Sequence, residues 1–381
     1  MNTKIKKILI VIIIILVIAL IGLLIYSLFI KTPDSTTIRP GDFPEGEESD
    51  FVPDEDFVFE SEMKIRAISE KDVLSPTTNN DKVTYYSPDG NIWKSNFDGT
   101  ELEQISDNVL DNLIMVFWSP NKNESITVFQ DTAGTVSKYL YNHENEQASS
   151  LNQYINYISW SPDGKKIAYQ YENKSTGDNT ISTSDPDGSK FSVILRTRIK
   201  DFAINWPNGS EIFLREKPSG LVPSSLYSLN ILSKAFSKII SDVYGFSAKW
   251  SLDGSKILYS RTDTKGKTIS LNVVNRNGSN QESLGINTLV EKCAWSQDIR
   301  IIYCAIPMNI DQARILPDDF YKGSFIGNDD FWKINIETGK KEKLLEELPE
   351  LYNAKDLFLS PNEDYLFFIN KNNGLLYSIK L

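Results

Sequence analysis

Few residues of this chain have the chemistry for acid–base catalysis or metal binding. The sequence contains one histidine, His143, and two cysteines, Cys293 and Cys304. Histidine-rich and Cys-x-x-Cys metal sites are therefore excluded. His143 lies among turn-forming residues in the segment 141–146, and no strong nucleophile is near it in the sequence. We expect His143 to be a turn residue and not a catalytic base.

Two short segments resemble parts of known sites. Residues 245–249, Gly-Phe-Ser-Ala-Lys, begin like the Gly-x-Ser-x-Gly nucleophile elbow but end in lysine. Residues 185–188, Asp-Pro-Asp-Gly, place oxygen atoms at alternate positions, yet a complete calcium loop needs several more ligands. Hairpin-turn chemistry explains the second segment. The residues thus predict no catalytic group, no metal site and no cofactor, and we expect a protein that is not an enzyme.

A sequence motif that recurs after residue 62 indicates which secondary-structure elements position these residues. It is clearest at 160–169, Trp-Ser-Pro-Asp-Gly-Lys-Lys-Ile-Ala-Tyr, and at 250–259, Trp-Ser-Leu-Asp-Gly-Ser-Lys-Ile-Leu-Tyr. Weaker copies begin at Leu74, Trp118, Asn205, Trp295 and Leu359. The residues at the serine position are 44, 42, 45, 45, 45 and 64 positions apart. Seven copies of about 45 residues are typical of a β-propeller in which each copy forms a four-stranded blade.

The motif and the chain ends predict how the blades are built. Proline, aspartate and glycine favour a tight turn after the first strand, and the tryptophan at that strand's end is expected to pack between neighbouring blades. Residues 64–69 read like the fourth strand at 101–106, whereas the seventh copy stops after a third strand at 375–379. We expect the N-terminal strand to complete the last blade and close the ring.

These repeats resemble the TolB-type, WD40-like propeller family, and they are similar to the propellers of prolyl-oligopeptidase-type peptidases. The resemblance covers about residues 64–381 and implies an all-β, seven-bladed propeller. No α/β-hydrolase domain like that of the peptidases is evident in the sequence. The chain differs from TolB in having a hydrophobic N-terminal segment, no separate N-terminal domain, and seven copies where TolB has six blades. TolB's role in an outer-membrane complex is therefore not carried over.

The N-terminal segment predicts a membrane anchor. Residues 8–30 contain no charged residue, and a helix of that length spans roughly 35 Å, enough to cross a bilayer. Lysines precede the segment, so residues 1–7 are expected in the cytoplasm and the remainder outside it, at a bacterial-type plasma membrane. A cleaved signal peptide would have a shorter apolar core and a cleavage site with small residues, which this segment lacks.

The charge distribution predicts a linker and argues against one class of partner. Residues 32–62 contain eleven Asp and Glu and one Arg, and prolines recur among them. Low hydrophobicity and high charge predict a disordered acidic linker over residues 31–62. The propeller domain, residues 63–381, has nearly balanced charge and no basic stripe, so we expect no nucleic-acid partner.

The two cysteines lie on either side of a predicted hairpin in blade six. Cys293 is on the first strand and Cys304 on the second. Facing residues in such a hairpin have Cβ atoms roughly 5 Å apart, so an exported domain could form this disulfide. A register shifted by one residue would point the two thiols apart, and both outcomes remain open.

Blade six is about 20 residues longer than the others, and the extra residues, about 306–328, follow its second strand. They include the candidate partner-binding residues Asp318, Asp319, Phe320, Tyr321 and Lys322. Aromatic residues among charges on a rigid scaffold are common anchors, although the loop could instead fold down over the channel or rim. The leading hypothesis is a membrane-anchored scaffold or sensor that binds a protein, peptide or envelope glycan. The alternative is a hydrolase or lactonase-like propeller with acidic residues or a metal ion at the channel mouth.

Overall fold

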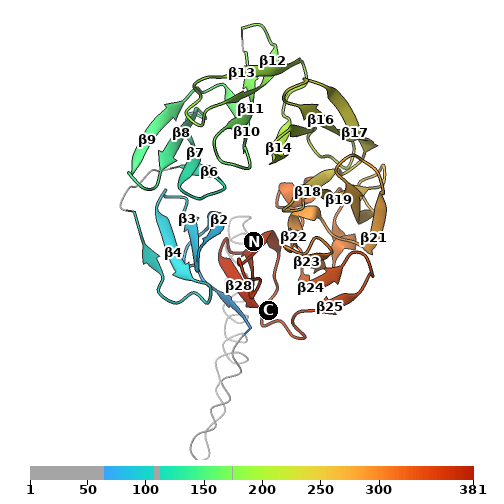
Figure 1. Ribbon diagram of the computed structural model, residues 1–381. Coiled ribbons are helices and arrows are strands. Elements are labelled where there is room, and N and C mark those ends of the chain that lie inside the picture. Colours follow the sequence, from blue (N-terminus) through green and yellow to red (C-terminus); the bar gives the residue numbers. More distant parts are fainter. Residues whose placement is uncertain (1–63, 107–111, 174) are drawn as a thin grey trace, which may run out of the picture. The chain divides into compact units, whose positions relative to one another are not determined.

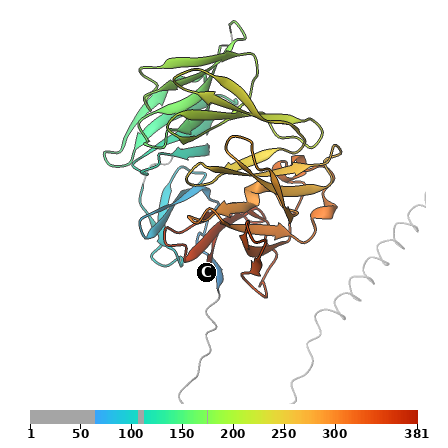
Figure 2. The ribbon, with the colours of Figure 1, turned by 45° about the vertical axis from the view of Figure 1, so that its right-hand side comes forward.

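The computed structural model describes residues 64–106, 112–173 and 175–381, which belong to a compact unit extending from Glu60 to Leu381. The described residues form seven four-stranded antiparallel sheets. The sheets are arranged around a common axis (Figures 1 and 2). In the first six blades along the chain, the first strand lies nearest the centre (Figure 1). The all-β, seven-bladed propeller predicted from the repeats is confirmed.

The first four blades follow the chain in order. Blade one contains β2 (Leu74–Asn79), β3 (Lys82–Tyr86), β4 (Ile92–Asn96) and β5 (Glu103–Gln104), and blade two contains β6 (Leu113–Trp118), β7 (Glu124–Gln130), β8 (Val136–Asn142) and β9 (Gln147–Leu151). Blade three contains β10 (Ile155–Trp160), β11 (Ile167–Glu172), β12 (Asn179–Ser184) and β13 (Ser192–Thr197). Blade four contains β14 (Ala203–Asn208), β15 (Glu211–Arg215), β16 (Ser224–Asn230) and β17 (Phe236–Val243).

The last three blades include the helical segments. Blade five contains β18 (Ser247–Trp250), β19 (Lys256–Thr262), β20 (Ile269–Asn275) and β21 (Glu282–Ile286). Blade six contains η1 (Val290–Lys292), β22 (Cys293–Trp295), β23 (Ile301–Pro307), η2 (Ile310–Gln312), α2 (Asp318–Tyr321), β24 (Asp329–Asn335) and β25 (Lys341–Lys343). Blade seven contains β26 (Ala354–Leu359), β27 (Tyr365–Asn370), β28 (Leu376–Lys380) and β1 (Ile65–Ala67).

Ring closure follows the prediction made from the chain ends. β1 pairs with β28 in antiparallel register, with Ile65 opposite Ile379 and Ala67 opposite Tyr377. The N-terminal strand thus completes the blade that the C-terminal residues begin. Because the last sheet gains its fourth strand in this way, the described part of the ring is closed by strands from both ends of the unit.

The motif residues act as their chemistry predicts. The Ser161 hydroxyl donates to Asp163 at 2.7 Å and accepts the Lys166 N–H at 2.9 Å, which fixes the turn. The indole N–H of each of three tryptophans donates to a backbone carbonyl on the first strand of the preceding blade: Trp118 to Ser75, Trp160 to Phe117 and Trp295 to Lys249. These tryptophans therefore join neighbouring blades.

One copy of the motif was assigned to the wrong turn. In blade one, Ser75 lies inside β2 at a bulge, with a φ of 49°, and the β2–β3 turn comes between Asn79 and Lys82. The better match to the motif, residues 87–90, closes the next turn, between β3 and β4. The local pattern identifies a tight turn but not which pair of strands it joins.

The predicted anchor and linker, residues 8–30 and 31–62, lie outside the described residues. Within the described ranges, no helix has the length and apolarity required to cross a bilayer.

Candidate functional site

The longest connection of the propeller lies on one face of the ring. Because each blade is an antiparallel meander, connections between second and third strands share a face with those that enter the first strands. We call this the α2 face. Over blades four to seven it comprises residues 216–223, 244–246, 263–268, 287–292, 308–328, 344–353 and 371–375.

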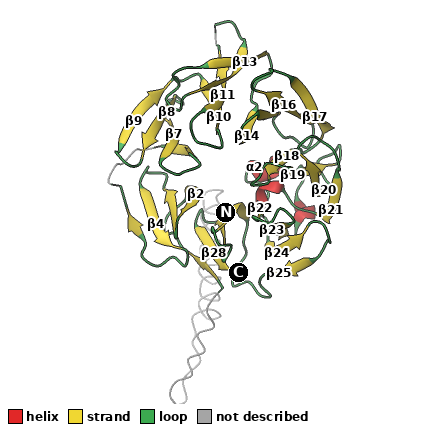
Figure 3. Ribbon diagram, in the orientation of Figure 1, coloured by secondary structure: helices red, strands yellow, loops and turns green. Residues whose placement is uncertain are grey.

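The insertion, residues 308–328, is folded down onto neighbouring blades. The Gly220 N–H of blade four donates to the Asp318 carboxylate at 2.7 Å, and the Leu316 N–H donates to the Gly266 carbonyl of blade five at 2.8 Å. A small apolar cluster buries the insertion residues Leu316, Phe320 and Phe325. The same cluster includes a residue of blade five and one of the connection between blades five and six. Figure 3 shows α2 on the inner side of the ring, close to β18.

The five candidate residues have different surroundings in the structure. Asp318 accepts hydrogen bonds from blade four, Asp319 accepts the backbone N–H groups of residues 314 and 315, and Phe320 is buried. The carboxylates of Asp318 and Asp319 thus hold the loop. Tyr321 is 46% exposed and Lys322 is also exposed, so these two are available to a partner.

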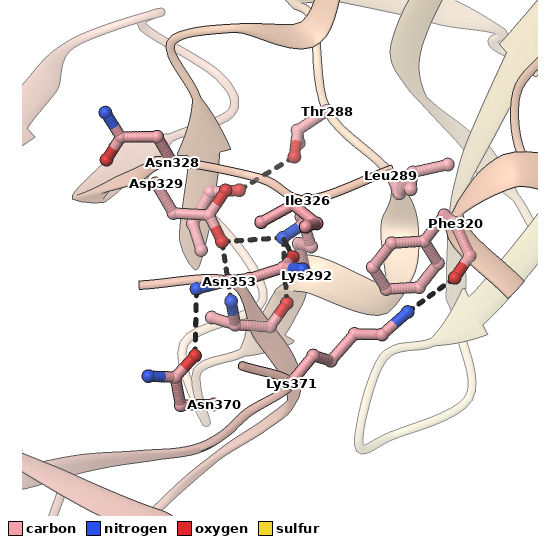
Figure 4. Close-up of polar contacts among 12 residues, drawn as sticks. Thr288, Leu289, Lys292, Phe320, Ile326, Asn328, Asp329, Asn353, Asn370 and Lys371 are labelled. Carbon is pink, nitrogen blue, oxygen red and sulfur yellow. Dashed lines mark hydrogen bonds and ion pairs between the residues drawn. The ribbon is translucent and has the colours of Figure 1, made fainter. Parts of the chain in front are cut away.

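A fully buried ion pair lies beneath the insertion. Lys292 Nζ is 2.6 Å from Asp329 Oδ2 and also donates to the Asn353 side chain and the Ala354 carbonyl, at 3.0 and 2.9 Å (Figure 4). Asp329 Oδ2 also accepts the Ala354 N–H at 2.6 Å. Burial lowers the pKa of Lys292 and raises that of Asp329, while their mutual attraction acts in the opposite direction. With its donors satisfied, Lys292 joins blades six and seven.

Lys371, from blade seven, contacts the insertion directly. Its Nζ lies 3.8 Å from the centroid of the Phe320 ring and donates to the Phe320 carbonyl (Figure 4). Burial and the neighbouring Lys292 ammonium lower the pKa of Lys371 to about 8. Phe320 therefore lies between two cations, since Lys292 Nζ is 5.3 Å from the same ring.

A second polar cluster lies near the axis at blade five. The hydroxyls of Ser247 and Tyr321 both donate to Glu291 Oε1. The Tyr321 hydroxyl is enclosed by Ser247 and Glu291 although the side chain as a whole is 46% exposed. Desolvation of this hydroxyl and the Glu291 carboxylate raise the pKa of Tyr321 well above its ordinary value, so its phenol stays protonated at neutral pH and acts as a donor. Two residues further along β18, Lys249 Nζ donates to carbonyls of Cys293 and Leu357, which links the first strands of blades five, six and seven.

The histidine lies on the opposite face, and the two cysteines lie within the blade-six sheet, where Cys293 directly follows the connection 287–292. Cys293 and Cys304 are directly opposite in the β22–β23 register, with sulfur atoms 2.12 Å apart, and both are buried. His143 follows β8, where its ring stacks on Trp118 and its Nε2 is 3.0 Å from the Ser125 hydroxyl. Burial lowers the pKa of His143 to about 4, so the ring is neutral at physiological pH.

Exposed apolar side chains occur in three connections of the α2 face, 216–223, 308–328 and 344–353. Six of them are between 46% and 65% exposed: Leu221, Val222, Met308, Tyr321, Ile326 and Leu351. Met308 and Leu351 line the same open groove, of about 530 Å³, together with Asp330, Lys343, Glu346 and Glu350. Lys343 pairs with Asp330 at 3.1 Å, which leaves the two glutamates as the unpaired charges of the groove among the described residues. Sequence reasoning identified Tyr321 alone among these six residues. Met308 and Ile326 lie in the same insertion, whereas Leu221, Val222 and Leu351 belong to shorter connections whose shared face becomes evident only when strand order is known.

No protein family model and no curated protein sequence matches the chain. An oligogalacturonate lyase solved in complex with manganese is 10% identical, with a TM-score of 0.61, and the match covers 83% of this chain and 93% of the lyase. The propeller domain of the Trilobed protease from Pyrococcus furiosus is 12% identical, with a TM-score of 0.53 and coverage of 80% and 92%. TolB from Acinetobacter baumannii is 14% identical, with a TM-score of 0.46 and coverage of 71% and 61%. The predicted likeness to peptidase propellers is thus confirmed for the fold.

The comparison corrects the expectation that this protein is not an enzyme. That expectation rested on the lack of a nucleophile elbow, a catalytic histidine and a metal-binding motif in the sequence, and of a hydrolase domain like that of the peptidases. The lyase is an enzyme, and 93% of its chain matches this propeller. A propeller can thus make up nearly an entire enzyme, and the lack of a second domain gives no reason to exclude catalysis.

The residues present do not fit a manganese site. The described ranges contain no group of three or more His, Cys, Asp or Glu side chains placed to hold a metal ion. His143 is already hydrogen-bonded to Ser125 within an aromatic cluster. Because the donor set is missing from the described chain, we derive no step through a metal.

Proposed function

We propose that this chain is a membrane-anchored, extracytoplasmic propeller that binds a partner protein through its α2 face. The observation that carries the proposal is the set of six exposed apolar side chains on this face. Large apolar groups exposed together on a firmly held scaffold are characteristic of interaction surfaces. The insertion is firmly held, because Asp318 bonds to blade four and Lys371 of blade seven donates to Phe320.

The charge of the face favours a particular kind of partner segment. The connection 344–353 contains three glutamates and no basic residue. Glu346 and Glu350 border the groove that Met308 and Leu351 also line. We therefore expect the bound segment to combine apolar side chains with lysine or arginine, because opposite charge steers association and fixes the register of docking.

The test is site-specific photocrosslinking in intact cells from positions 326 and 351. Both positions should capture the same protein, and Ile326→Glu or Leu351→Glu should abolish its co-purification with the full chain. Leu232 is the matched control, since it is 89% exposed and lies on the opposite face, between β16 and β17. Equal capture from position 232, or co-purification unaffected by both glutamate variants, would refute the proposal.

The proposed membrane topology is tested separately. The full chain should remain with the membrane after high-salt washing, and a chain beginning at residue 32 and exported by a cleavable signal should be soluble. Protease added to intact spheroplasts should digest the propeller. Protection of the propeller from that protease would contradict an extracytoplasmic location.

A further inference from the structure

Blade three carries a groove that is separate from the α2 insertion. Its volume is about 550 Å³, within the range of about 300–1,000 Å³ seen for small-ligand sites. Its floor is one face of the sheet, because Tyr169 and Tyr171 of β11 lie opposite Ser182 and Thr180 of β12, and alternate residues share a face. Tyr169 also packs into the core between blades two and three. The groove continues that interface outward, to Val193 of β13.

The floor of this groove is polar although it lies on a core-facing side of the sheet. The hydroxyls of Thr180 and Ser182 are 3.1 Å apart, and Ser182 is buried. Both hydroxyls can donate and accept hydrogen bonds. A sheet face that served only to pack against blade two would carry apolar residues at these positions, as Ile155 does nearer the axis.

Two opposite charges border the floor without neutralising each other. Asp178 precedes β12, and Arg196 is opposite Thr180 in the β12–β13 register. Neither belongs to any ion pair among the described residues. The groove therefore offers a carboxylate acceptor and a guanidinium donor to a bound molecule.

An aromatic ring lies at the edge of the same groove. Phe191 lines it and is 68% exposed, which leaves a large apolar surface in water next to the polar floor. The face of an aromatic ring carries partial negative charge and attracts polarised C–H groups. A ligand that fits must thus present an apolar C–H surface on one side and several hydroxyl groups on the other.

We propose that the blade-three groove binds an oligosaccharide. Neighbouring sugar units of one chain supply these two kinds of contact. The axial C–H groups of one ring pack on Phe191, which is next to Ser192, the partner of Thr183. Hydroxyls of units further along the groove accept from Arg196 and donate to Asp178, which lies five residues from Thr183 along the chain. Thr180 and Ser182 complete the contacts with the floor. A peptide side chain fits less well, because peptide grooves anchor side chains in apolar pockets, whereas this floor is lined with hydroxyls.

The first experiment applies the full chain, in a detergent without a sugar headgroup, to an array of defined oligosaccharides. We expect binding to at least one structural class, and the best member is then titrated by calorimetry. Phe191→Ala and Asp178→Asn should each weaken its binding about tenfold or more. Leu232→Ala removes a similarly exposed apolar side chain outside the groove and should leave the affinity unchanged.

Each outcome decides the proposal. Failure of the whole array to bind, or binding that survives both Phe191→Ala and Asp178→Asn, overturns it. Preferential binding of a control peptide set at the same groove also overturns it. Thermal melts of both variants establish that they are folded, and Phe191→Tyr should restore binding, because it keeps the aromatic face while changing the edge.

Discussion

The buried pair Lys292–Asp329 allows the sharpest test of how blades six and seven are joined. In Lys292→Met, Asp329 stays buried and keeps the Ala354 N–H as a donor but loses its cation, while its other oxygen, Oδ1, has no hydrogen-bond partner in the structure. Removing one member of a buried pair costs about 3–5 kcal/mol. We therefore expect Lys292→Met to lose about that much free energy of unfolding at pH 7, measured for the full chain by urea titration with tryptophan fluorescence.

The same argument predicts the direction in which the stability of Lys292→Met changes with pH. Without Lys292, burial alone raises the pKa of Asp329, so the folded variant binds a proton more readily than the unfolded chain. Stability of the variant then falls as pH rises through that raised pKa. The deficit relative to the unmodified protein should be smaller at pH 5 than at pH 7.

Two further variants complete this experiment. Lys292→Met/Asp329→Asn removes the unpaired charge and should recover about 2 kcal/mol of the loss. Lys200→Met, at an exposed lysine, should change stability by less than about 0.5 kcal/mol. A Lys292→Met protein within about 0.5 kcal/mol of the parent, or a deficit that is the same at pH 5 and pH 7, would refute the view that this pair is ionised and structurally required.

Three other measurements test separate features. Thiol titration of the denatured full chain should find no free thiol before reduction and two after it, since Cys293 and Cys304 form a disulfide. Reduction should lower the free energy of unfolding by up to about 3 kcal/mol for a loop of this length. The pKa of His143 is lowered to about 4 in the folded protein, so the unfolded chain takes up a proton first as pH falls. The free energy of unfolding should therefore drop by about 1–3 kcal/mol between pH 6.5 and 4. The drop should be smaller in His143→Gln, which has no imidazole to protonate. Gly278 has a φ of +86°, and a Cβ there would lie 2.7 Å from the Ile239 carbonyl oxygen, so Gly278→Ala should lower the urea midpoint. Gly339→Ala is the control and should lower the midpoint less, because a Cβ at Gly339 meets open space.

The repeat architecture was predictable because its information is local and repeated. The Ser161–Asp163 turn and the hydrogen bond of Trp160 to the preceding blade both come from residues of the repeated motif. The copies of the motif therefore support one another even where a single copy is weak. The pairing of Cys293 with Cys304 depended on the register of one hairpin, which the sequence left open and in which the structure places the two residues opposite each other. Blade one shows the limit, since a tight turn at residues 87–90 carries the same letters as the motif but joins different strands.

The polar contacts beneath the insertion could not be predicted in the same way. Lys292 and Asp329 are 37 positions apart, and Asn353 is a further partner from the connection to blade seven. Nothing in the local sequence distinguishes this buried lysine from an exposed one. The expectation about catalysis failed for a different reason, because it was drawn from catalytic motifs and a hydrolase domain that are not evident in the sequence, and such absences do not exclude catalysis.

The two proposed surfaces can be separated by mutation because the ring is built from separate blades. The insertion is held by blades four, five and seven, through Asp318, Leu316 and Lys371. The groove is formed by blade three and the connection that enters it. Since distant sites with no shared partners behave additively, Ile326→Glu should abolish capture of the protein partner without changing oligosaccharide affinity, and Phe191→Ala should do the reverse. Loss of both activities in either variant would mean that one ligand spans the two surfaces or that the blades are coupled more strongly than their separate cores imply.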